Sequence, residues 1–442
     1  MKYESAKSGI LIFLIALSLL LYYLLWTDQG GNIEAVDSGS TMEQERIGAT
    51  KEIGQVVKPD RIYQHMEGDH YGTVSVEELN SLVDLLKQFS FDSFQNISSE
   101  VENVSQFMEN RTNSIELRFP GDVPFGIYKN ILGMEGDNSF DFDTIILSYT
   151  LNAENKAAVY FISQSNKRVY ETSIVAQDVE KLEAFKKHVK EAESAYLTYF
   201  AYRPNDQYLI YLPKEKVEVN KYKYFTRKIE SIRLKRALFS NPSIAQKEIY
   251  SNWEEYTDDS GLLRIYKDTH VVSFFKPSGI TNELNNQNHI ISNSIELMNQ
   301  RGGWINNYLY VGNDDDTRVT FRLYNTNGMP VFNLTTQISD IRLDWENSIA
   351  QRLFTNNLVI INTNTPFDFS KETVSSGQDV LLYFQNNKKV KQEKIQNIVL
   401  GYNMQVDSQS IVSLQPTWFY QYDNKWYQLS SDGTGGNVDG LE

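Results

Sequence analysis

The longest apolar pattern in the chain lies close to its start. Residues 8–27 carry no charged side chain, and a helix of this length, at about 1.5 Å per residue, spans the roughly 30 Å hydrocarbon core of a bilayer. We therefore predict a membrane-spanning helix over 8–27, after a cytoplasmic tip over 1–7. Lys2 and Lys7 precede the helix, which predicts a cytoplasmic N-terminus and an extracytoplasmic location for the bulk of the chain.

Aromatic residues at the far end of this segment favour an uncleaved anchor over a cleaved secretory signal, which is the alternative interpretation. Tyr22 and Trp26 suit a membrane–water interface, and no A-x-A-like cleavage site follows closely. Together with Lys2 and Lys7 they are the predicted interface anchors. No second run of comparable length and hydrophobicity follows, so a single-pass protein of the cell membrane is predicted.

One face of the predicted helix combines small and large apolar residues. The residues Gly9, Ile12, Ala16, Leu19 and Tyr23 recur at intervals of three and four. Small residues allow a second transmembrane helix to approach closely. We therefore predict that this face binds a partner helix; the alternative is that it contacts only lipid.

Beyond the anchor, the periodicity changes repeatedly between that of helices and that of strands. Residues 28–52 are polar and rich in Gly and Ser, which predicts a flexible stalk. Ser75 and Glu78 have the spacing of a capping box before an apolar stripe, which predicts a helix. Further helices are predicted over 178–196, 221–239 and 288–300. The predicted strands are 114–119, 144–151, 157–162, 169–175, 197–202, 208–212, 262–266, 270–275, 319–323, 329–334, 379–384, 395–402 and 418–422.

These elements predict an α+β fold with mostly antiparallel sheets flanked by helices. A helix followed by a hairpin occurs twice in the second half of the chain, which suggests two related domains there. The predicted parts are an N-terminal extracytoplasmic domain over 53–203, a middle domain over 204–286, a C-terminal domain over 287–430 and a disordered tail over 431–442.

Composition excludes several classes of function. The formal net charge is −15, which argues against a nucleic-acid partner because phosphate binding needs a concentrated basic surface. The chain has no cysteine, so it can form neither disulfides nor thiolate sites. It also lacks the G-x-S-x-G, H-E-x-x-H and Walker-type motifs. We therefore predict neither an enzyme nor a bound cofactor.

Two groups of polar residues could be considered as metal sites. His65 and His70 flank Glu67 and Asp69, but this spacing matches no common ligand pattern, and a surface loop is the favoured interpretation. The acidic segment 313–316 lacks the alternate-residue spacing, the glycine and the distal glutamate of an EF-hand. It is interpreted as a hairpin turn, and no metal site is predicted.

Two further groups of residues have sugar-related interpretations as alternatives to simpler structural ones. Asp258, Asp259 and Asp268 could serve as paired carboxylates for sugar hydrolysis, although turn formation explains them more simply. Aromatic residues crowd the segment 416–427, including Trp418 and Trp426. They could form a glycan-binding face, which is our alternative functional hypothesis, or alternate into a core.

Short segments along almost the whole chain occur in a characteristic order. They are MKYES (1–5), LWT (25–27), ALFSNPS (237–243), EEY (254–256), DTH (268–270), GGW (302–304), VTFRL (319–323), PVF (330–332), GY (401–402) and PTW (416–418). In this order they resemble the YycH family of regulatory proteins from Gram-positive Firmicutes.

The resemblance implies a non-enzymatic regulatory role. YycH-family proteins sit in the membrane with the related YycI and restrain or tune the sensor histidine kinase YycG (WalK) of an essential cell-wall two-component system. The expected partners are therefore this kinase, a YycI-like protein and the membrane, with a second copy of the chain as a further candidate. The resemblance also implies that the last two extracytoplasmic domains share a fold with YycI, and it assigns no catalytic, cofactor-binding or metal-binding residues.

Overall fold

The computed structural model describes residues 14–19, 45–66, 68–134, 139–191, 196–280, 289–314 and 317–429. The chain divides into two units, Met1–Glu43 and Gln44–Glu442, which are described separately. In the first unit, residues 14–19 are helical and their side chains are exposed. Within the described ranges, no helix combines the length and the apolar character needed to cross a membrane.

Most of the predicted membrane segment falls outside the described residues. Of the predicted partner-binding face, Ala16 and Leu19 are described. The remaining predicted residues, Gly9, Ile12 and Tyr23 on that face and the anchors Lys2, Lys7, Tyr22 and Trp26, lie outside the described ranges.

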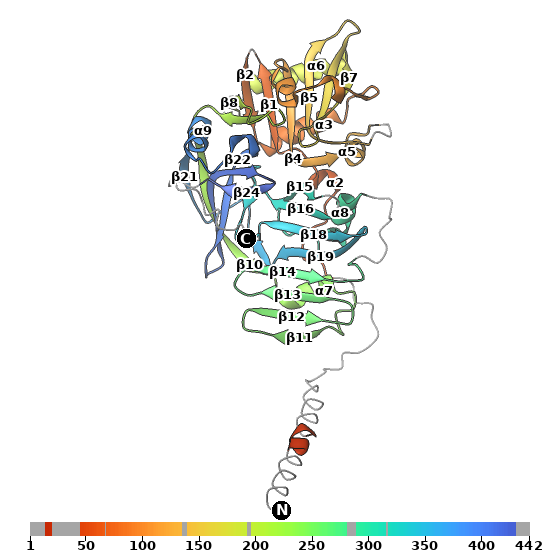
Figure 1. Cartoon of the computed structure of the whole chain (residues 1–442), viewed down its shortest axis with the longest axis vertical. Coiled ribbons are helices and arrows are strands. Elements are labelled where there is room, and N and C mark those ends of the chain that lie inside the picture. The colour runs from red at the N-terminus through yellow and green to blue at the C-terminus, as the bar shows by residue number, and fades with distance from the viewer. Residues whose placement is uncertain are drawn as a thin grey trace, which may run out of the picture. The chain divides into compact units, whose positions relative to one another are not determined.

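The second unit contains three sheets, of which the first, the N-terminal sheet, has nine strands (Figure 1). Its spatial order is β3-β7-β6-β5-β4-β1-β2-β8-β9. The strands are β1 (Arg61–Met66), β2 (Asp69–Thr73), β3 (Gln95–Asn96), β4 (Ser114–Pro124), β5 (Asp141–Leu151), β6 (Lys156–Ser163), β7 (Arg168–Val175), β8 (Leu197–Tyr202) and β9 (Ile210–Pro213). The helices of this region are α2 (Ile53–Val56), α3 (Val76–Leu86), η1 (Ser98–Glu100), α4 (Val104–Glu109), α5 (Phe125–Leu132) and α6 (Ala176–Glu191).

Alternation along β5 explains why helices pack on both faces of the N-terminal sheet. Ile145 and Leu147 join the core that contains Leu82 of α3 and Leu182 of α6. Ile146, between them, joins a separate cluster with Met108 of α4. Because successive strand residues point to opposite faces, the apolar run in β5 is buried on both sides.

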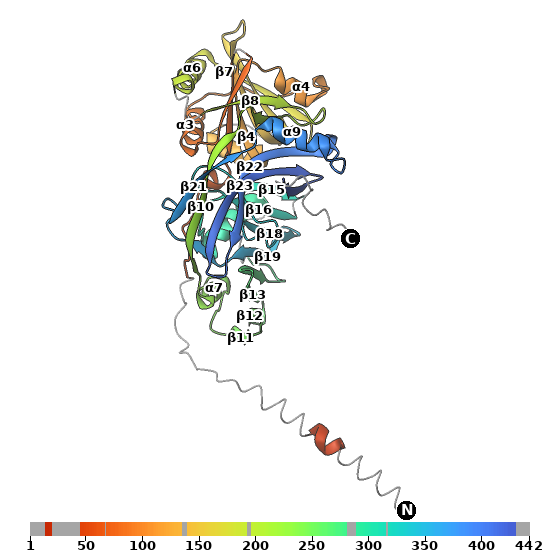
Figure 2. The same ribbon diagram turned by 90° about the vertical axis from the view of Figure 1, so that its left-hand side faces the viewer.

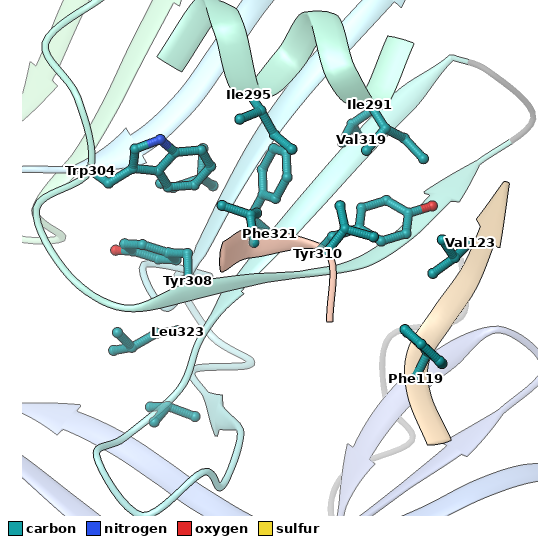
Figure 3. Packing of buried hydrophobic residues seen from close by; sticks show 14 of the residues in the cluster. Phe119, Val123, Ile291, Ile295, Trp304, Tyr308, Tyr310, Val319, Phe321 and Leu323 are labelled. Atoms are coloured by element: carbon teal, nitrogen blue, oxygen red, sulfur yellow. The ribbon is translucent and has the colours of Figure 1, made fainter. Parts of the chain in front are cut away.

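The central sheet has eight strands in the order β11-β12-β13-β14-β19-β18-β16-β15. The strands are β11 (Gln246–Ile249), β12 (Trp253–Thr257), β13 (Leu262–Tyr266), β14 (Val271–Phe275), β15 (Tyr308–Asp314), β16 (Arg318–Leu323), β18 (Asp340–Glu346) and β19 (Ile349–Asn356), and helices α7 (Ser231–Leu238) and α8 (Ile290–Gln300) accompany them. Figure 3 shows Ile291 and Ile295 of α8 beside Val319 and Phe321 of β16. One face of this sheet is therefore apolar and covered by helix.

The C-terminal sheet has seven strands and draws them from distant parts of the chain (Figure 2). The path is β17-β22-β23-β10-β20, with β21 also paired to β10 and β24 to β23. The strands are β10 (Val217–Lys228), β17 (Val331–Phe332), β20 (Leu358–Ile360), β21 (Asp368–Val374), β22 (Ile395–Val406), β23 (Ile411–Tyr422) and β24 (Lys425–Gln428), with helices α9 (Gly377–Asn386) and η2 (Gln392–Lys394). Phe384 of α9 packs on Tyr420 of β23, with ring centroids 5.0 Å apart.

The α+β class with mostly antiparallel sheets is confirmed, but strand pairing crosses the predicted boundary at 286/287. Tyr222 of β10 lies opposite Leu414 of β23, and Phe274 of β14 lies opposite Leu353 of β19. The segments 204–286 and 287–430 therefore both contribute to the central and C-terminal sheets, and 204–286 also supplies β9 to the N-terminal sheet, across the predicted boundary at 203/204. The repeated helix–hairpin order does not correspond to two separate sheets.

Two predicted elements and part of the stalk differ from the structure. Residues 217–228 form β10, so the helix predicted over 221–239 is limited to α7. Residues 379–384, predicted as a strand, lie within α9. Residues 45–52 of the predicted flexible stalk are packed against the end of α8, where Lys51 N donates to Asn299 Oδ1 (2.9 Å).

The N-terminal and central sheets touch where β4 meets β15. Tyr310 Oη of β15 donates to the backbone carbonyl of Asp122 in β4 (3.0 Å). A Cβ atom at Gly121 would lie only 2.4 Å from the Val311 carbonyl oxygen, so glycine permits this approach. Figure 3 places Phe119 and Val123 of β4 on the side facing Tyr310.

Candidate functional site

A cleft of about 1240 Å³ opens beside this contact and receives residues from all three sheets. Its walls come from β4 and β9 of the N-terminal sheet, β16 and β18 of the central sheet, and β22 and β24 of the C-terminal sheet. Concave sites of this kind, at the junction of several elements, are where proteins commonly bind ligands. The cleft is therefore the candidate functional site.

The wall from the central sheet is formed by its polar face. Strand alternation that buries Val319 and Phe321 under α8 places Arg318, Thr320 and Arg322 on the opposite side. In the neighbouring strand β18, Asp344, Arg342 and Asp340 lie directly opposite these three residues. The result is a ladder of three cross-strand pairs that faces the cleft.

The pairs in this ladder are not equivalent. Arg318 Nε donates to Asp344 Oδ1 (2.7 Å), and Arg322 forms two bonds with Asp340 (3.0 and 2.8 Å). Arg342 lies opposite Thr320, which carries no charge. Within the described residues Arg342 forms no ion pair, and its buried Nε atom has no hydrogen-bond partner. Arg342 is thus the arginine of this wall without a direct ion pair in the described part of the chain, although Asp340 and Asp344 lie two residues to either side of it on β18.

The wall from the N-terminal sheet carries two aspartates. Ser163 Oγ donates to Asp122 Oδ1 (2.8 Å) and Ser165 Oγ donates to Asp122 Oδ2. Burial, together with the nearby charge of Asp143, raises the pKa of Asp122 to about 6. Burial also raises the pKa of Asp143, although the Arg118 guanidinium opposes this shift. The wall from the N-terminal sheet thus combines these two aspartates with Arg61 and Arg118, and the wall from the central sheet contains an arginine without a direct ion pair among the described residues.

Arg118 also contacts a polar cluster in which His65, Glu116 and Tyr211 are buried and His70 is half-buried. His65 on β1 lies opposite His70 on β2, and their Nδ1 atoms are 2.8 Å apart. His65 Nε2 is 3.2 Å from Glu116 Oε2, and Arg118 Nε donates to the other Glu116 oxygen. Burial alone would raise the pKa of Glu116, but Arg118 and the hydrogen bond from His65 lower it to about 2. Glu116 is therefore an ionised, fully paired buried carboxylate.

The histidine pair sets a limit on protonation in this cluster. One Nδ1 must donate and the other must accept, so the two rings cannot both be doubly protonated while this bond persists. Burial and the neighbouring His65 lower the pKa of His70 to about 4. The interpretation of 65–70 as a surface loop was wrong for both histidines, since each lies within a strand and His65 is buried.

Sequence comparison places the chain in a known family. The pattern described as YycH protein, C-terminal domain, matches residues 207–432, and the one described as YycH protein, N-terminal domain, matches residues 4–194. The chain belongs to the YycH family. It is 22% identical over 453 residues to the "Two-component system WalR/WalK regulatory protein YycH" of Bacillus subtilis strain 168, covering 98% of this chain and 97% of that protein.

The fold of this YycH-family chain is also similar to a solved structure. The crystal structure of YycH from Bacillus subtilis superposes with a TM-score of 0.72 at 18% sequence identity, over 88% of this chain and 100% of that one. The likeness shows a shared fold.

The aromatic residues at the C-terminal end of this YycH-family chain separate into two environments. Trp418 is 4% exposed and its Nε1 donates to the Ser375 carbonyl (3.0 Å), on the side of the C-terminal sheet that lines a smaller pocket of about 360 Å³. Trp426 and Tyr427 of β24 instead line the large cleft. The sequence could not assign Trp418 and Trp426 to different environments, because β24 reaches the cleft only through its pairing with β23.

The other acidic candidates of the YycH-family chain serve turns. Asp258 Oδ1 accepts hydrogen bonds from the backbone N–H groups of Ser260 and Gly261, each at 2.8 Å, and neither Asp259 nor Asp268 lines the cleft. Asn313 and Asp314 end β15, and the rest of that acidic segment lies outside the described residues. No group of three or more potential metal ligands is present within the described ranges.

Sequence reasoning missed the residues that distinguish the cleft. Arg342 and Asp122 belong to no motif, and each depends on strand pairing to reach the site. The available signal was the alternation of polar and apolar residues over 318–323. It identified one polar face of a strand, but it did not show which other strands lie opposite that face.

Proposed function

We propose that this chain is a non-enzymatic regulator of a WalR/WalK-type two-component system. The observation that carries the proposal is the match to both YycH domains, together with coverage of 97% of a relative named as the regulatory protein of that system. In this proposal the chain restrains the sensor histidine kinase (WalK) and acts with a YycI-like protein. A second copy of the chain is a further candidate partner.

The proposed location is the cell membrane, with one N-terminal anchor and the bulk of the chain outside. The uncharged run over 8–27, flanked by Lys2 and Lys7, supports this arrangement. Regulation requires that the chain bind one state of the kinase more tightly than another, because equal binding to both states leaves the equilibrium between them unchanged.

The proposed contact with the kinase is the helix face of Gly9, Ile12, Ala16, Leu19 and Tyr23. Single interhelical hydrogen bonds in lipid contribute only about 0.6 kcal/mol, so close packing must supply most of the affinity. Small Ala16 would permit this packing, and in an ideal helix Leu14 and Ser18 lie on the opposite side.

Replacement of Ala16 tests this contact. We expect Ala16→Leu in the full-length chain to reduce both co-purification with WalK and the restraint of a WalR-dependent reporter, because the larger side chain separates the helices. Ser18→Leu is the matched control, since it adds a leucine to the opposite side and keeps the segment apolar. Equal behaviour of the two variants would remove this helix face from the mechanism.

Site-specific photo-cross-linking tests the partner directly. A photoreactive residue at Leu19 should link the full-length chain to WalK or to a YycI-like protein in intact membranes, whereas the same residue at Leu14 should link mainly to lipid. If neither the anchor nor any extracytoplasmic position links to the kinase or to a YycI-like protein, and deletion of the chain leaves the reporter unchanged, the proposed regulation is refuted.

A further inference from the structure

The large cleft is rich in amide side chains, since nine of its 36 lining residues are Asn or Gln. Among them, Gln164, Asn333 and Gln396 already bond within the protein. An amide both donates and accepts hydrogen bonds. A hydroxyl group does the same, so an amide can bond to it in either direction. Ligand pockets for drug-sized molecules are mostly apolar, so this lining suits a hydrated molecule with many hydroxyl groups. The wall from the N-terminal sheet adds the carboxylates of Asp122 and Asp143, which already accept hydrogen bonds from Ser163 and Gln164, respectively.

An aromatic surface stands at one side of the same cleft. The Trp426 ring lies 5.0 Å from the Phe332 ring and 5.6 Å from the Arg322 guanidinium carbon. Tyr427, the next residue of the strand, points to the opposite face of the sheet, where its ring lies 5.5 Å from that of Tyr420. An aromatic side chain with one polar edge offers a flat apolar face and a hydrogen-bonding group. The flat face suits the C–H face of a sugar ring, and the polar edge suits its hydroxyl groups.

Two arginines at the cleft have unsatisfied donors. Arg342 forms no direct ion pair among the described residues, and its buried Nε atom has no hydrogen-bond partner there. Arg118 also lines the cleft; its side chain is 9% exposed, and its Nη2 atom has no hydrogen-bond partner within the described residues. A buried donor without a partner is costly, and a carboxylate matches the planar guanidinium group. The cleft thus combines polyol-compatible walls with donors for one anion.

We propose that this cleft binds an acidic sugar, that is, a saccharide ring carrying a carboxylate. The carboxylate pairs with Arg342, and the ring hydroxyls bond to the amide side chains and to Asp122 while the ring lies against Trp426. This activity is separate from contact between the anchor and the kinase, and either one can hold without the other. The acidic sugar would be a ligand that the extracytoplasmic part recognises.

The first test compares two sugars that differ by one carboxylate-bearing group. N-acetylmuramic acid and N-acetylglucosamine are titrated separately against the full-length chain in detergent micelles and followed by ligand-observed NMR. We expect saturable binding of the acid sugar and at least tenfold weaker binding of the neutral sugar. Equal binding of both sugars, or no saturable binding of the acid sugar, overturns the proposal. Inorganic phosphate is titrated in parallel, and binding as tight as that of the acid sugar would show a simple anion site instead.

The second test places a carboxylate beside Arg342 from within the protein. Thr320 lies directly opposite Arg342, so the glutamate in Thr320→Glu should pair with the guanidinium and compete with the ligand. We expect at least a tenfold loss of acid-sugar affinity, with a melting temperature no lower than that of the matched control Thr320→Gln. Retained affinity in folded Thr320→Glu contradicts the assignment of Arg342.

A matched pair of arginine substitutions completes the design. Arg352 lies on the adjacent strand, opposite Asp344; like Arg342 it packs over Phe354, but it does not line the cleft. Arg342→Gln should abolish the preference for the acid sugar, whereas Arg352→Gln should preserve it. Equal losses in both variants would assign the effect to general weakening of the sheet and refute the site.

Discussion

The imidazoles of His65 and His70 share one hydrogen bond through their Nδ1 atoms, and this bond couples the charge of the cluster to the stability of the N-terminal sheet. The pKa of His70 is lowered to about 4, first by burial and then by His65. Between pH 6.5 and 4 the unfolded chain therefore binds a proton that the folded chain does not. Stability from this group is present above pH 6.5 and is lost as the pH falls through that window.

The substitution His70→Gln should remove this dependence. We expect the free energy of unfolding to decrease less between pH 7 and pH 4.5 than in the parent chain, by roughly 1–2 kcal/mol after allowance for partial solvent exposure. Urea denaturation at the two pH values measures the difference. Identical decreases in parent and variant would mean that His70 is protonated equally in both states.

Asp122 should show the opposite pH dependence. Its pKa of about 6 exceeds the ordinary value of 3.8 because of burial and Asp143, so the folded chain retains a proton that the unfolded chain has already lost. Stability therefore decreases as the pH rises from about 4 to above 6. Asp122→Asn should remove this decrease and stabilise the protein at pH 8 by about 1 kcal/mol, as measured by urea denaturation. A destabilised variant at pH 8 would show that the ionised carboxylate is required there.

At the scale of elements, two serine caps illustrate how local signals combine with distant partners. Ser376 and Asp379 bond reciprocally at the start of α9. Ser75 accepts from the Glu78 backbone N–H (3.3 Å), but the Glu78 carboxylate instead contacts His188 and Tyr196, each at 3.0 Å. The predicted capping residue is thus confirmed, while the reciprocal half of the box is replaced by contacts with His188 of α6 and with Tyr196, which lies after that helix.

Removal of the Ser75 hydroxyl should weaken α3. We expect Ser75→Ala to lower the free energy of unfolding by about 1 kcal/mol, because a backbone N–H at the helix start loses its acceptor. Ser81→Ala, on the exposed face of the same helix, is the control and should be neutral or slightly stabilising. Equal effects of both substitutions, compared by thermal unfolding, would show that the cap contributes nothing specific.

Six of the nine strands of the N-terminal sheet were predicted from sequence, from β4 to β9, whereas β1, β2 and β3 were not. The prediction failed where the deciding contacts were distant. In β10, lysines alternate with buried Tyr222 and Tyr224, and only pairing with β23 and β21 selects the strand. In 379–384 the apolar run suggested a strand, but the Ser376 cap and the burial of Val380 and Phe384, four residues apart, produce a helix.

At the scale of the whole molecule, the central and C-terminal sheets depend on each other's sequence segments. β10 has its partners at 358–374 and 411–414, and β14 has its partner β19 at 352–356. The N-terminal sheet, in contrast, takes all its strands from 61–213. The cleft could not be predicted from sequence because its walls form only when all three sheets are in place.

Separated segments should show this difference. We expect residues 45–213 to retain a cooperative unfolding transition, because all nine strands of their sheet are present. Residues 204–286 should remain unfolded, since β10 and β14 lack the strands that cover their edges. Circular dichroism and hydrogen exchange on the two polypeptides measure this outcome. A cooperatively folded 204–286 segment would support an independent middle domain.

The placement of β10 inside the C-terminal sheet also imposes an order on biogenesis. If the chain is exported from its N-terminus, β10 leaves the translocation channel well before β23, which closes the sheet about 190 residues later. During that interval its tyrosine-rich edge is open to wrong partners, so folding factors outside the membrane would be needed most at this stage. A nonsense mutation shortly before residue 411 would then leave an exported but incomplete product that quality-control proteases can recognise, even though most of the polypeptide has been made.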